Sequence, residues 1–140
     1  MSESIQDGFL LIDKPAGITS HDVIDLLRRS SGIRRIGHAG TLDPFATGLL
    51  LVGVGKATKE LSKFVGLDKV YEATFVLGAS SSTDDPEGVI TRTENWKIVI
   101  ENTQKKIEQA MKEVTGKIQQ IPPTFSAIRL KGKKMYEAAR

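Results

Sequence analysis

Two kinds of hydrophobic periodicity follow one another along this chain, and their order constrains the fold more than any other feature. Short apolar runs at residues 9–12 and 49–55 lie next to Gly or Pro and are typical of buried β-strands. Between them, apolar residues recur at helical spacing over residues 20–31. Strands and helices mix here without a regular strand–helix–strand repeat, so the sequence predicts an α+β fold. The 140 residues are enough for one domain with a sizeable core.

The first helix is predicted from its ends as well as from its periodicity. Ser20 can accept a hydrogen bond from a free backbone N–H and so cap the first turn. Val23, Leu26 and Leu27 fall on one face and form the expected buried stripe. Gly32 can adopt the left-handed backbone that ends many helices.

Two further elements are predicted before the middle of the chain. Residues 57–66 read as a short helix, and its inward-facing residues are expected to be Leu61, Phe64 and Val65. Residues 69–78, KVYEATFVLG, alternate at period two and predict a strand. That strand would place Tyr71 on the same face as Phe75.

The second half of the chain predicts shorter elements. In chain order they are a polar turn at 79–88, a returning strand at 88–93 that forms a hairpin, a helix at 103–116, a strand at 123–130, a turn at 131–134 and the start of a helix at 135–140. Asn102 or Thr103 is expected to cap the helix at 103–116. Its apolar stripe comprises Ile107, Ala110, Met111 and Val114.

Composition excludes several classes of protein. The chain has no cysteine, which rules out disulfides and thiolate metal sites. Its N-terminus lacks the basic region and apolar run of a secretory signal. No apolar run approaches the roughly 20 residues that span a bilayer. We therefore expect a cytoplasmic protein.

The charge of the chain is unevenly distributed. Net charge is +3, yet residues 91–140 contain 11 Lys or Arg and only 5 Asp or Glu. The first 90 residues contain 9 basic and 12 acidic side chains. A basic region of this kind attracts polyanions such as RNA or DNA. A solvated surface has the same composition, so charge alone leaves both interpretations open.

Nucleotide-binding and zinc motifs fail at defined positions. Ala57 follows the Gly-Lys pair where a phosphate-binding loop needs Ser or Thr. Thr58 stands where the dinucleotide-binding pattern needs its last glycine. The only histidines are His21 and His38, and without cysteine they do not make a zinc ligand set.

Residues 37–50, GHAGTLDPFATGLL, place a carboxylate and an imidazole among glycines and apolar side chains. In a structural interpretation, Asp43 caps a helix that Pro44 begins, and His38 is an ordinary satisfied histidine. In a functional interpretation, Pro44 favours extended geometry at Asp43, and the glycines let a ligand approach closely. A carboxylate positioned in this way can act as a nucleophile.

The sequence around this stretch carries a resemblance. GHAGTLDPFATGLLLVGVGKATK resembles the catalytic-loop motif of the TruB family of tRNA pseudouridine synthases. GFLLIDKPAGITSHDVI resembles the first motif of that family, KVYEATFVLG its tyrosine strand, and IPPTFSAIRLKGKKMYEAAR its later proline-serine segment. The blocks lie in family order and span nearly all of the chain. The resemblance implies a mixed, mainly antiparallel sheet flanked by helices.

The resemblance also implies roles for single residues. Asp43 stands where the family has its catalytic aspartate, the nucleophile in uridine isomerisation. Tyr71 matches the tyrosine that stacks on the target uracil and assists proton removal, and His38 matches a histidine that contacts the RNA around the flipped nucleotide. Lys14 and Pro15 belong to a motif that packs beside the active site.

The implied substrate is the uridine at position 55 in the T arm of tRNA, and the implied reaction uses no cofactor or metal. The basic residues expected to neutralise RNA phosphates are Arg129, Lys131, Lys133, Lys134 and Arg140. Ser82 departs from the family, which often carries an acid at this position, and this puts a local hydrogen bond in question.

The family continues past the segment at 135–140 to a strand whose arginine pairs with the aspartate, and usually to a small RNA-binding domain. The resemblance therefore implies that residues 1–140 are the N-terminal part of a catalytic domain. Such a part would act with a C-terminal part, in the same chain or a separate one. The alternative is a non-catalytic RNA-binding or assembly module. Both interpretations stay open at the level of the sequence.

Overall fold

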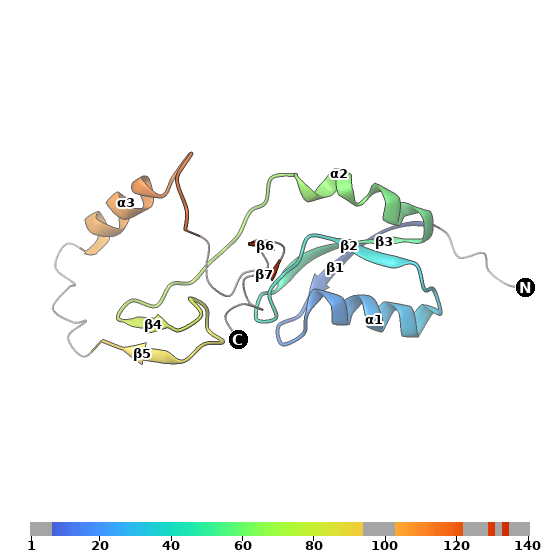
Figure 1. Ribbon diagram of the computed structural model, residues 1–140, viewed down its shortest axis with the longest axis horizontal. Coiled ribbons are helices and arrows are strands. Elements are labelled where there is room, and N and C mark those ends of the chain that lie inside the picture. Colours follow the sequence, from blue (N-terminus) through green and yellow to red (C-terminus); the bar gives the residue numbers. More distant parts are fainter. Residues whose placement is uncertain (1–6, 94–102, 122–128, 131–132, 135–140) are drawn as a thin grey trace, which may run out of the picture. The chain divides into compact units, whose positions relative to one another are not determined.

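A computed structural model describes residues 7–93, 103–121, 129–130 and 133–134. The chain divides into two compact units, Met1–Glu72 and Ala73–Arg140, which are described separately (Figure 1). Within the described residues, no helix has the length and apolar character needed to cross a membrane.

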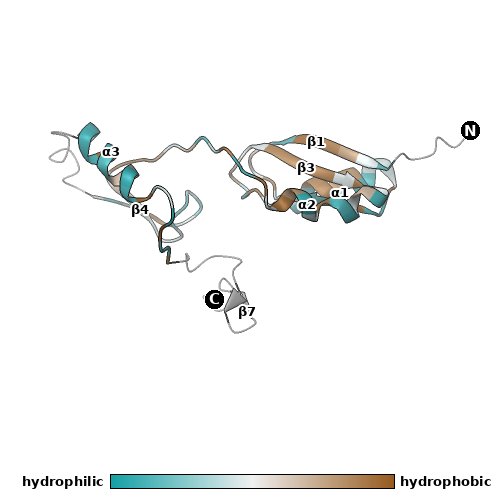
Figure 2. Ribbon diagram, turned by 90° about the horizontal axis from the view of Figure 1, so that it is seen from above, coloured by the Kyte–Doolittle hydropathy of each residue, from teal (hydrophilic) through white to brown (hydrophobic). Residues whose placement is uncertain are grey.

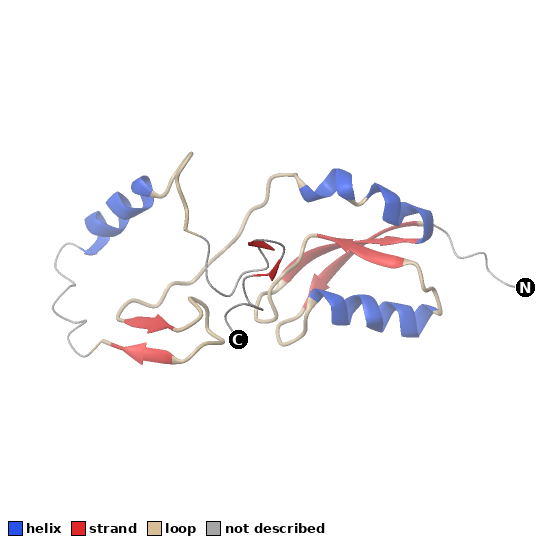
Figure 3. Ribbon diagram, viewed as in Figure 1, coloured by secondary structure: helices blue, strands red, loops and turns tan. Residues whose placement is uncertain are grey.

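The first unit is built on a three-stranded antiparallel sheet (Figures 1 and 3). Its strands are β1 (Gly8–Lys14), β2 (Ile36–Ala39) and β3 (Gly48–Val54), in the order β1-β3-β2. The register places Lys14 opposite Gly48 and Ile36 opposite Val54. The strands expected at 9–12 and 49–55 are therefore confirmed as β1 and β3.

Helix α1 (Ser20–Ser31) packs on this sheet and completes the core. The buried apolar cluster comprises Val23, Ile24, Ile36, Leu50, Val52 and Val54. Branched aliphatic side chains at alternating strand positions meet one face of the helix, as expected for a sheet covered by a helix. With antiparallel sheets and helices throughout the described residues, the predicted α+β class is confirmed.

The buried face of α1 differs from the predicted one. Leu26 is 50% exposed, whereas Ile24 is 1% exposed. The face that meets the sheet runs through Ser20, Val23, Ile24 and Leu27, which is the i, i+3, i+4, i+7 pattern of a helix. The prediction for Leu26 is wrong because two apolar stripes overlap in this sequence, one through Leu26 and one through Ile24. The stripe through Ile24 is the one that packs against the sheet.

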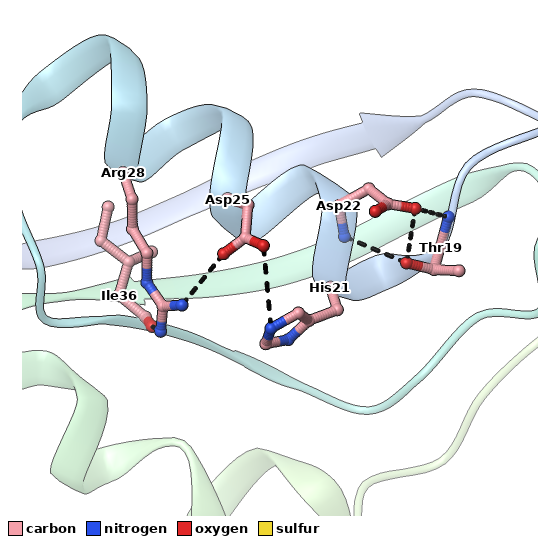
Figure 4. A network of polar contacts seen from close by, with 6 residues as sticks. All are labelled: Thr19, His21, Asp22, Asp25, Arg28 and Ile36. Carbon is pink, nitrogen blue, oxygen red and sulfur yellow. Dashed lines mark hydrogen bonds and ion pairs between the residues drawn. The ribbon is translucent and has the colours of Figure 1, made fainter.

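The N-terminal cap of α1 also differs from the prediction, whereas its C-terminal end at Gly32 agrees with it. Thr19 rather than Ser20 is the N-cap, and its hydroxyl accepts a hydrogen bond from the Asp22 N–H at 3.0 Å. The Asp22 carboxylate accepts in turn from the Thr19 N–H at 2.8 Å, which completes a capping box (Figure 4). Gly32 ends the helix in the left-handed conformation, as predicted.

Farther along α1, Asp25 and Arg28 form an ion pair at 3.1 Å (Figure 4). Arg28 also donates to the Ile36 carbonyl at 2.9 Å, and this contact ties the end of the helix to the start of β2.

The short helix expected at 57–66 is a 3₁₀ helix, η1 (Gly55–Glu60), followed by a single α-helical turn, α2 (Ser62–Val65). Leu61 is buried, and Phe64 packs edge-to-face on Phe9 with ring centroids 5.1 Å apart. Val65 is 53% exposed, so its predicted inward position is wrong. One turn of helix presents too narrow an apolar face to bury both Phe64 and the residue next to it.

The strand predicted at 69–78 is absent from the sheets of the described residues. Its apolar residues are exposed, Val70 fully and Phe75 by 85%. Alternation specifies which side chains would share a face, but a strand forms only where a neighbour satisfies its backbone N–H and C=O groups. No such neighbour pairs with this segment in the described structure, and the prediction is wrong there.

The second unit holds a hairpin, a helix and a very short strand pair. The elements are β4 (Ala79–Ser81), β5 (Ile90–Arg92), α3 (Thr103–Glu113), β6 (Arg129–Leu130) and β7 (Lys133–Lys134). The hairpin predicted around the polar turn is confirmed by the antiparallel pairing of β4 and β5. The turn predicted at 131–134 is wrong for Lys133 and Lys134, because these residues pair with β6.

Helix α3 confirms the helix predicted at 103–116 except for its last residues. Its predicted apolar stripe is mostly exposed: Ile107 by 37%, Met111 by 62% and Val114 by 66%. Much of α3 is hydrophilic, whereas the strands β1 and β3 are largely hydrophobic (Figure 2). The predicted cap at Asn102, the strand at 123–128 and the helix at 135–140 lie outside the described residues.

Candidate active site on the loop before β3

The loop between β2 and β3 carries Asp43 and folds as a tight turn. The Ala46 N–H donates to the Asp43 carbonyl at 3.1 Å, which closes a β-turn with Pro44 at its second position. No helix follows, since Gly48 already begins β3. The interpretation of Asp43 as a helix cap is therefore wrong. The side chain of Asp43 is exposed to solvent.

The residue before Asp43 is anchored by Ser20. The Ser20 hydroxyl donates to the Leu42 carbonyl at 3.1 Å and accepts from the Leu42 N–H at 2.9 Å. Ser20 is 1% exposed, and the Leu42 side chain packs against the core. A single hydroxyl thus satisfies both backbone groups of Leu42.

The residue after Asp43 is anchored by the loop that follows β1. The Pro44 carbonyl accepts from the Gly17 N–H at 2.8 Å and from Lys14 Nζ at 3.2 Å. The same ammonium donates to the carbonyls of Pro15 at 2.9 Å and Ile18 at 2.7 Å. The two loops at this end of the sheet are therefore joined by a single charged side chain.

Burial makes that lysine unusual. Lys14 is completely buried, and an unpaired buried charge is strongly unfavourable. Here the three N–H donors of the ammonium meet three carbonyl oxygens, so each donor has an acceptor. Gly17 has φ +86°, a backbone that favours glycine in the turn that delivers its N–H to Pro44.

The Asp43 carboxylate itself has no hydrogen bond or ion pair within the part of the chain that the structure describes. Its neighbours on both sides have anchored backbones, while its own side chain is exposed to solvent. Phe45, two residues farther along the same turn, is 40% exposed. The site therefore combines a fixed backbone with an unengaged carboxylate, the arrangement that a nucleophile open to a substrate requires.

His38 lies on β2, opposite Val52, and is half-buried. Its Nδ1 is 2.6 Å from the carbonyl oxygen of Gly40. Because a carbonyl only accepts, Nδ1 carries the hydrogen, and Nε2 is the ring atom left for another partner. His38 therefore lies on the strand that precedes the Asp43 loop, next to the middle strand of the sheet.

For the other residues implied by the resemblance, the structure gives only their exposure or the strand on which they lie. Tyr71 is 70% exposed, and no hydrogen bond or ring contact of its side chain occurs among the described residues. Arg129 lies on β6, and Lys133 and Lys134 lie on β7. Lys131 and Arg140 lie outside the described residues. The structure places His38 on β2 and Asp43 on the loop that follows it, and no contact joins the two side chains among the described residues. The roles of all these residues therefore rest on the resemblance.

Sequence reasoning missed the contact between Ser20 and Leu42. One signal was present: Ser20 occupies the first position of the buried i, i+3, i+4, i+7 stripe of α1. A hydroxyl at a buried stripe position needs a partner outside its own helix.

The chain that carries this loop is similar in sequence to known proteins. A family model described as "TruB family pseudouridylate synthase (N terminal domain)" matches residues 28–140. The tRNA pseudouridine synthase B of Thermobifida fusca (strain YX) is 48% identical over 134 residues, which cover 96% of this chain and 45% of the relative. The enzyme of the same name from Corynebacterium efficiens is 43% identical over 141 residues, covering 100% of this chain and 46% of the relative.

A solved structure gives a more partial match. A chain in "Structure of H/ACA RNP bound to a substrate RNA containing 2'-deoxyuridine" is 39% identical, covers 40% of this chain and has a TM-score of 0.39; the match spans 18% of that chain. The sequence matches are far more extensive, although the chain spans less than half the length of these curated relatives. The family model covers most of the chain, including the Asp43 loop, and the chain belongs to the TruB family of pseudouridylate synthases.

Proposed function

We propose that this chain forms the nucleophile-bearing part of an enzyme that converts uridine to pseudouridine in tRNA, at position 55 of the T arm. The observation that carries the proposal is the exposed carboxylate of Asp43 on a loop whose backbone is anchored at Leu42 and Pro44. Family membership supports it, because the matched region includes this loop.

The reaction is an isomerisation, so substrate and product contain the same atoms apart from protons exchanged with solvent. The bond between N1 of uracil and C1′ of ribose breaks, and a bond between C5 and C1′ forms. The hydrogen on C5 leaves as a proton, and N1 gains one. The carboxylate of Asp43 supplies the nucleophile for this exchange and is released unchanged at the end.

The target nucleotide must leave the base stack before the carboxylate reaches it, which costs a few kcal/mol. Tyr71 offers an exposed aromatic face for the flipped base, and such stacking is worth roughly 1–3 kcal/mol. We assign to His38 a contact with the RNA around the flipped nucleotide, made through its Nε2 atom because Nδ1 is engaged by Gly40.

The basic residues of this chain, and the greater length of its relatives, suggest the remaining partners. Arg129, Lys131, Lys133 and Lys134 are proposed to neutralise tRNA phosphates, which predicts binding that weakens as salt increases. The C-terminal part found in the longer relatives is proposed to complete the active site, and the cytoplasm is the proposed location. Neither a metal nor a cofactor enters the proposed chemistry.

The decisive experiment measures tritium release from tRNA labelled at uracil C5. Two forms are assayed: the 140-residue chain alone, and the chain joined to the C-terminal part of the Thermobifida fusca relative. Asp43→Asn should abolish release, whereas Asp68→Asn removes a different exposed carboxylate and should retain it. If neither form releases tritium but both bind tRNA in a salt-sensitive manner, the non-catalytic RNA-binding module is the correct function.

The stacking role of Tyr71 has its own test. Tyr71→Phe retains the aromatic face and should keep tRNA affinity, while Tyr71→Ala should weaken binding roughly tenfold or more. Phe75 is another highly exposed aromatic in the same segment, so Phe75→Ala is the matched control. Equal weakening by Tyr71→Phe and Tyr71→Ala would refute stacking as the main contribution.

A further inference from the structure

The hydroxyl of Ser20 is buried at the first residue of α1 but does not cap the helix. Thr19 provides the cap, and its hydroxyl contacts Asp22 within the same helix. Ser20 instead directs its hydroxyl across to the loop before β3, 22 residues away in sequence. The polar group at this buried position is therefore engaged outside its own helix.

The two hydrogen bonds to Leu42 use the hydroxyl as donor and as acceptor. A serine hydroxyl has one donor and two acceptor positions, so both contacts, at 3.1 and 2.9 Å, can form at once. In this way Ser20 substitutes for a neighbouring strand and holds the peptide groups on both sides of Leu42. The second of these peptide groups is the one that leads directly into Asp43.

We propose that Ser20 is a positioning residue, which sets the direction of the Asp43 carboxylate through the backbone of Leu42. This inference rests on the proposed function of Asp43 as the nucleophile. On the other side of Asp43, the Gly17 N–H and Lys14 hold the Pro44 carbonyl. With both neighbours anchored, the Cα–Cβ bond of Asp43 has a defined direction, and Ser20 supplies the anchor on the N-terminal side.

The energetic expectation follows from what the hydroxyl holds. Ser20→Ala frees the Leu42 N–H and C=O, so the backbone entering Asp43 gains freedom while the carboxylate stays chemically intact. A displacement of about 1 Å at a reacting group can lower the rate on the order of a hundredfold. Substrate affinity depends on other contacts, so kcat should fall while KM for tRNA stays unchanged.

The test compares Ser20→Ala with Thr19→Ala. Thr19→Ala weakens the N-terminus of the same helix but removes no contact to the loop, so it controls for helix stability. Amide hydrogen exchange in the full 140-residue chain reports on Leu42, with the core amide of Val52 as reference. We expect Leu42 exchange to rise roughly tenfold in Ser20→Ala and to stay unchanged in Thr19→Ala.

Tritium release supplies the catalytic measurement, in whichever of the two forms described above is active. Ser20→Ala should lower kcat roughly ten- to a hundredfold with KM unchanged, and Thr19→Ala should retain kcat. An unchanged rate of Leu42 exchange in Ser20→Ala, or an equal loss of kcat in both variants, would overturn the positioning role.

A second variant covers the case in which Ser20→Ala does not fold. Ser20→Cys keeps a weaker donor and acceptor and should raise Leu42 exchange by a smaller factor; no increase would count against the proposal. Failure of the proposed function is recognised separately. If wild type releases no tritium in either form, the role of Asp43 is refuted, whereas the exchange data still decide whether Ser20 holds Leu42.

Discussion

The buried ammonium of Lys14 lies 3.2 Å from the carbonyl oxygen of Pro44, and 30 positions in the sequence separate the two residues. This contact joins the turn after β1 to the turn that carries Asp43. It also accounts for a fully buried lysine, because the ammonium has carbonyl acceptors for its donors.

Removing the ammonium should destabilise the first unit. Lys14→Met keeps the length and apolar stem but removes the ammonium donor of the Pro15 and Ile18 carbonyls and one of the two donors to the Pro44 carbonyl, so we expect a loss of about 2–4 kcal/mol. Urea unfolding followed by circular dichroism measures it. Lys69 also donates to two backbone carbonyls, but it is exposed, so Lys69→Met should change stability by less than about 0.5 kcal/mol. Equal effects would show that burial of Lys14 has no energetic importance.

The buried face of α1 can be tested with two leucine-sized residues. Ile24→Ala opens a cavity against the sheet and should cost about 2–5 kcal/mol, since Ile24 is 1% exposed. Leu26→Ala should cost less than about 1 kcal/mol, since Leu26 is 50% exposed. Thermal unfolding of the two variants gives the comparison. A larger loss of stability for Leu26→Ala than for Ile24→Ala would show that the buried face of α1 is the one expected from the sequence.

Gly53, on β3, lies close to η1 and to Leu61. A Cβ atom there would lie 3.2 Å from the Ala57 carbonyl group and from Leu61. Gly53→Ala should therefore destabilise by about 1–3 kcal/mol through overpacking. A methyl group at Gly8, on β1, would have nothing within 4 Å, so Gly8→Ala should be neutral or slightly stabilising. Denaturant midpoints of the two variants provide the measurement, and equal midpoints would refute the tight packing of η1.

The capping box predicts a specific acid sensitivity. Hydrogen bonds from the Thr19 hydroxyl and then from the Thr19 backbone lower the pKa of Asp22 below 3.8. A carboxyl whose folded pKa is depressed stabilises the fold above its unfolded pKa, and this stabilisation disappears as pH falls through the folded pKa. Asp22→Asn should thus be less stable than wild type above pH 3.8 and converge with it in stronger acid.

The NMR titration of Asp22 checks the cause of this shift. Thr19→Ala removes the first hydrogen bond and should raise the pKa of Asp22 toward 3.8. A midpoint that stays where it is in wild type would assign the shift to something other than the capping box.

The features that sequence predicted well are local ones. The helix at α1 and its end at Gly32 depend on periodicity and on one glycine, and both are found. The hairpin of β4 and β5 depends on a polar turn between β-prone residues, and it is found as well. The cap at Thr19 was missed although local sequence carried its signal, because Thr19 and Asp22 have the spacing of a capping box. The contact between Ser20 and Leu42 is a tertiary one that local sequence does not reveal.

The site shows the same division between local and distant information. Local sequence favoured a helix after Asp43, whereas the loop forms a β-turn whose neighbours are held by residues 14–20. The likeness of whole blocks, rather than any single pattern, pointed to the correct family. Pairing of the segment at 69–78 depends on a neighbouring strand, and alternation within the segment carries no information about that neighbour.

The anchored loop has a consequence for the entropy of catalysis. Fixing one residue's backbone costs about 1–2 kcal/mol, and at Leu42, Asp43 and Pro44 that ordering is already present in the folded chain. A cation or substrate that engages the Asp43 carboxylate has only the side-chain torsions left to restrict. In the proposed function, most of the ordering that the reacting carboxylate needs is therefore completed when the protein folds, before the RNA substrate binds.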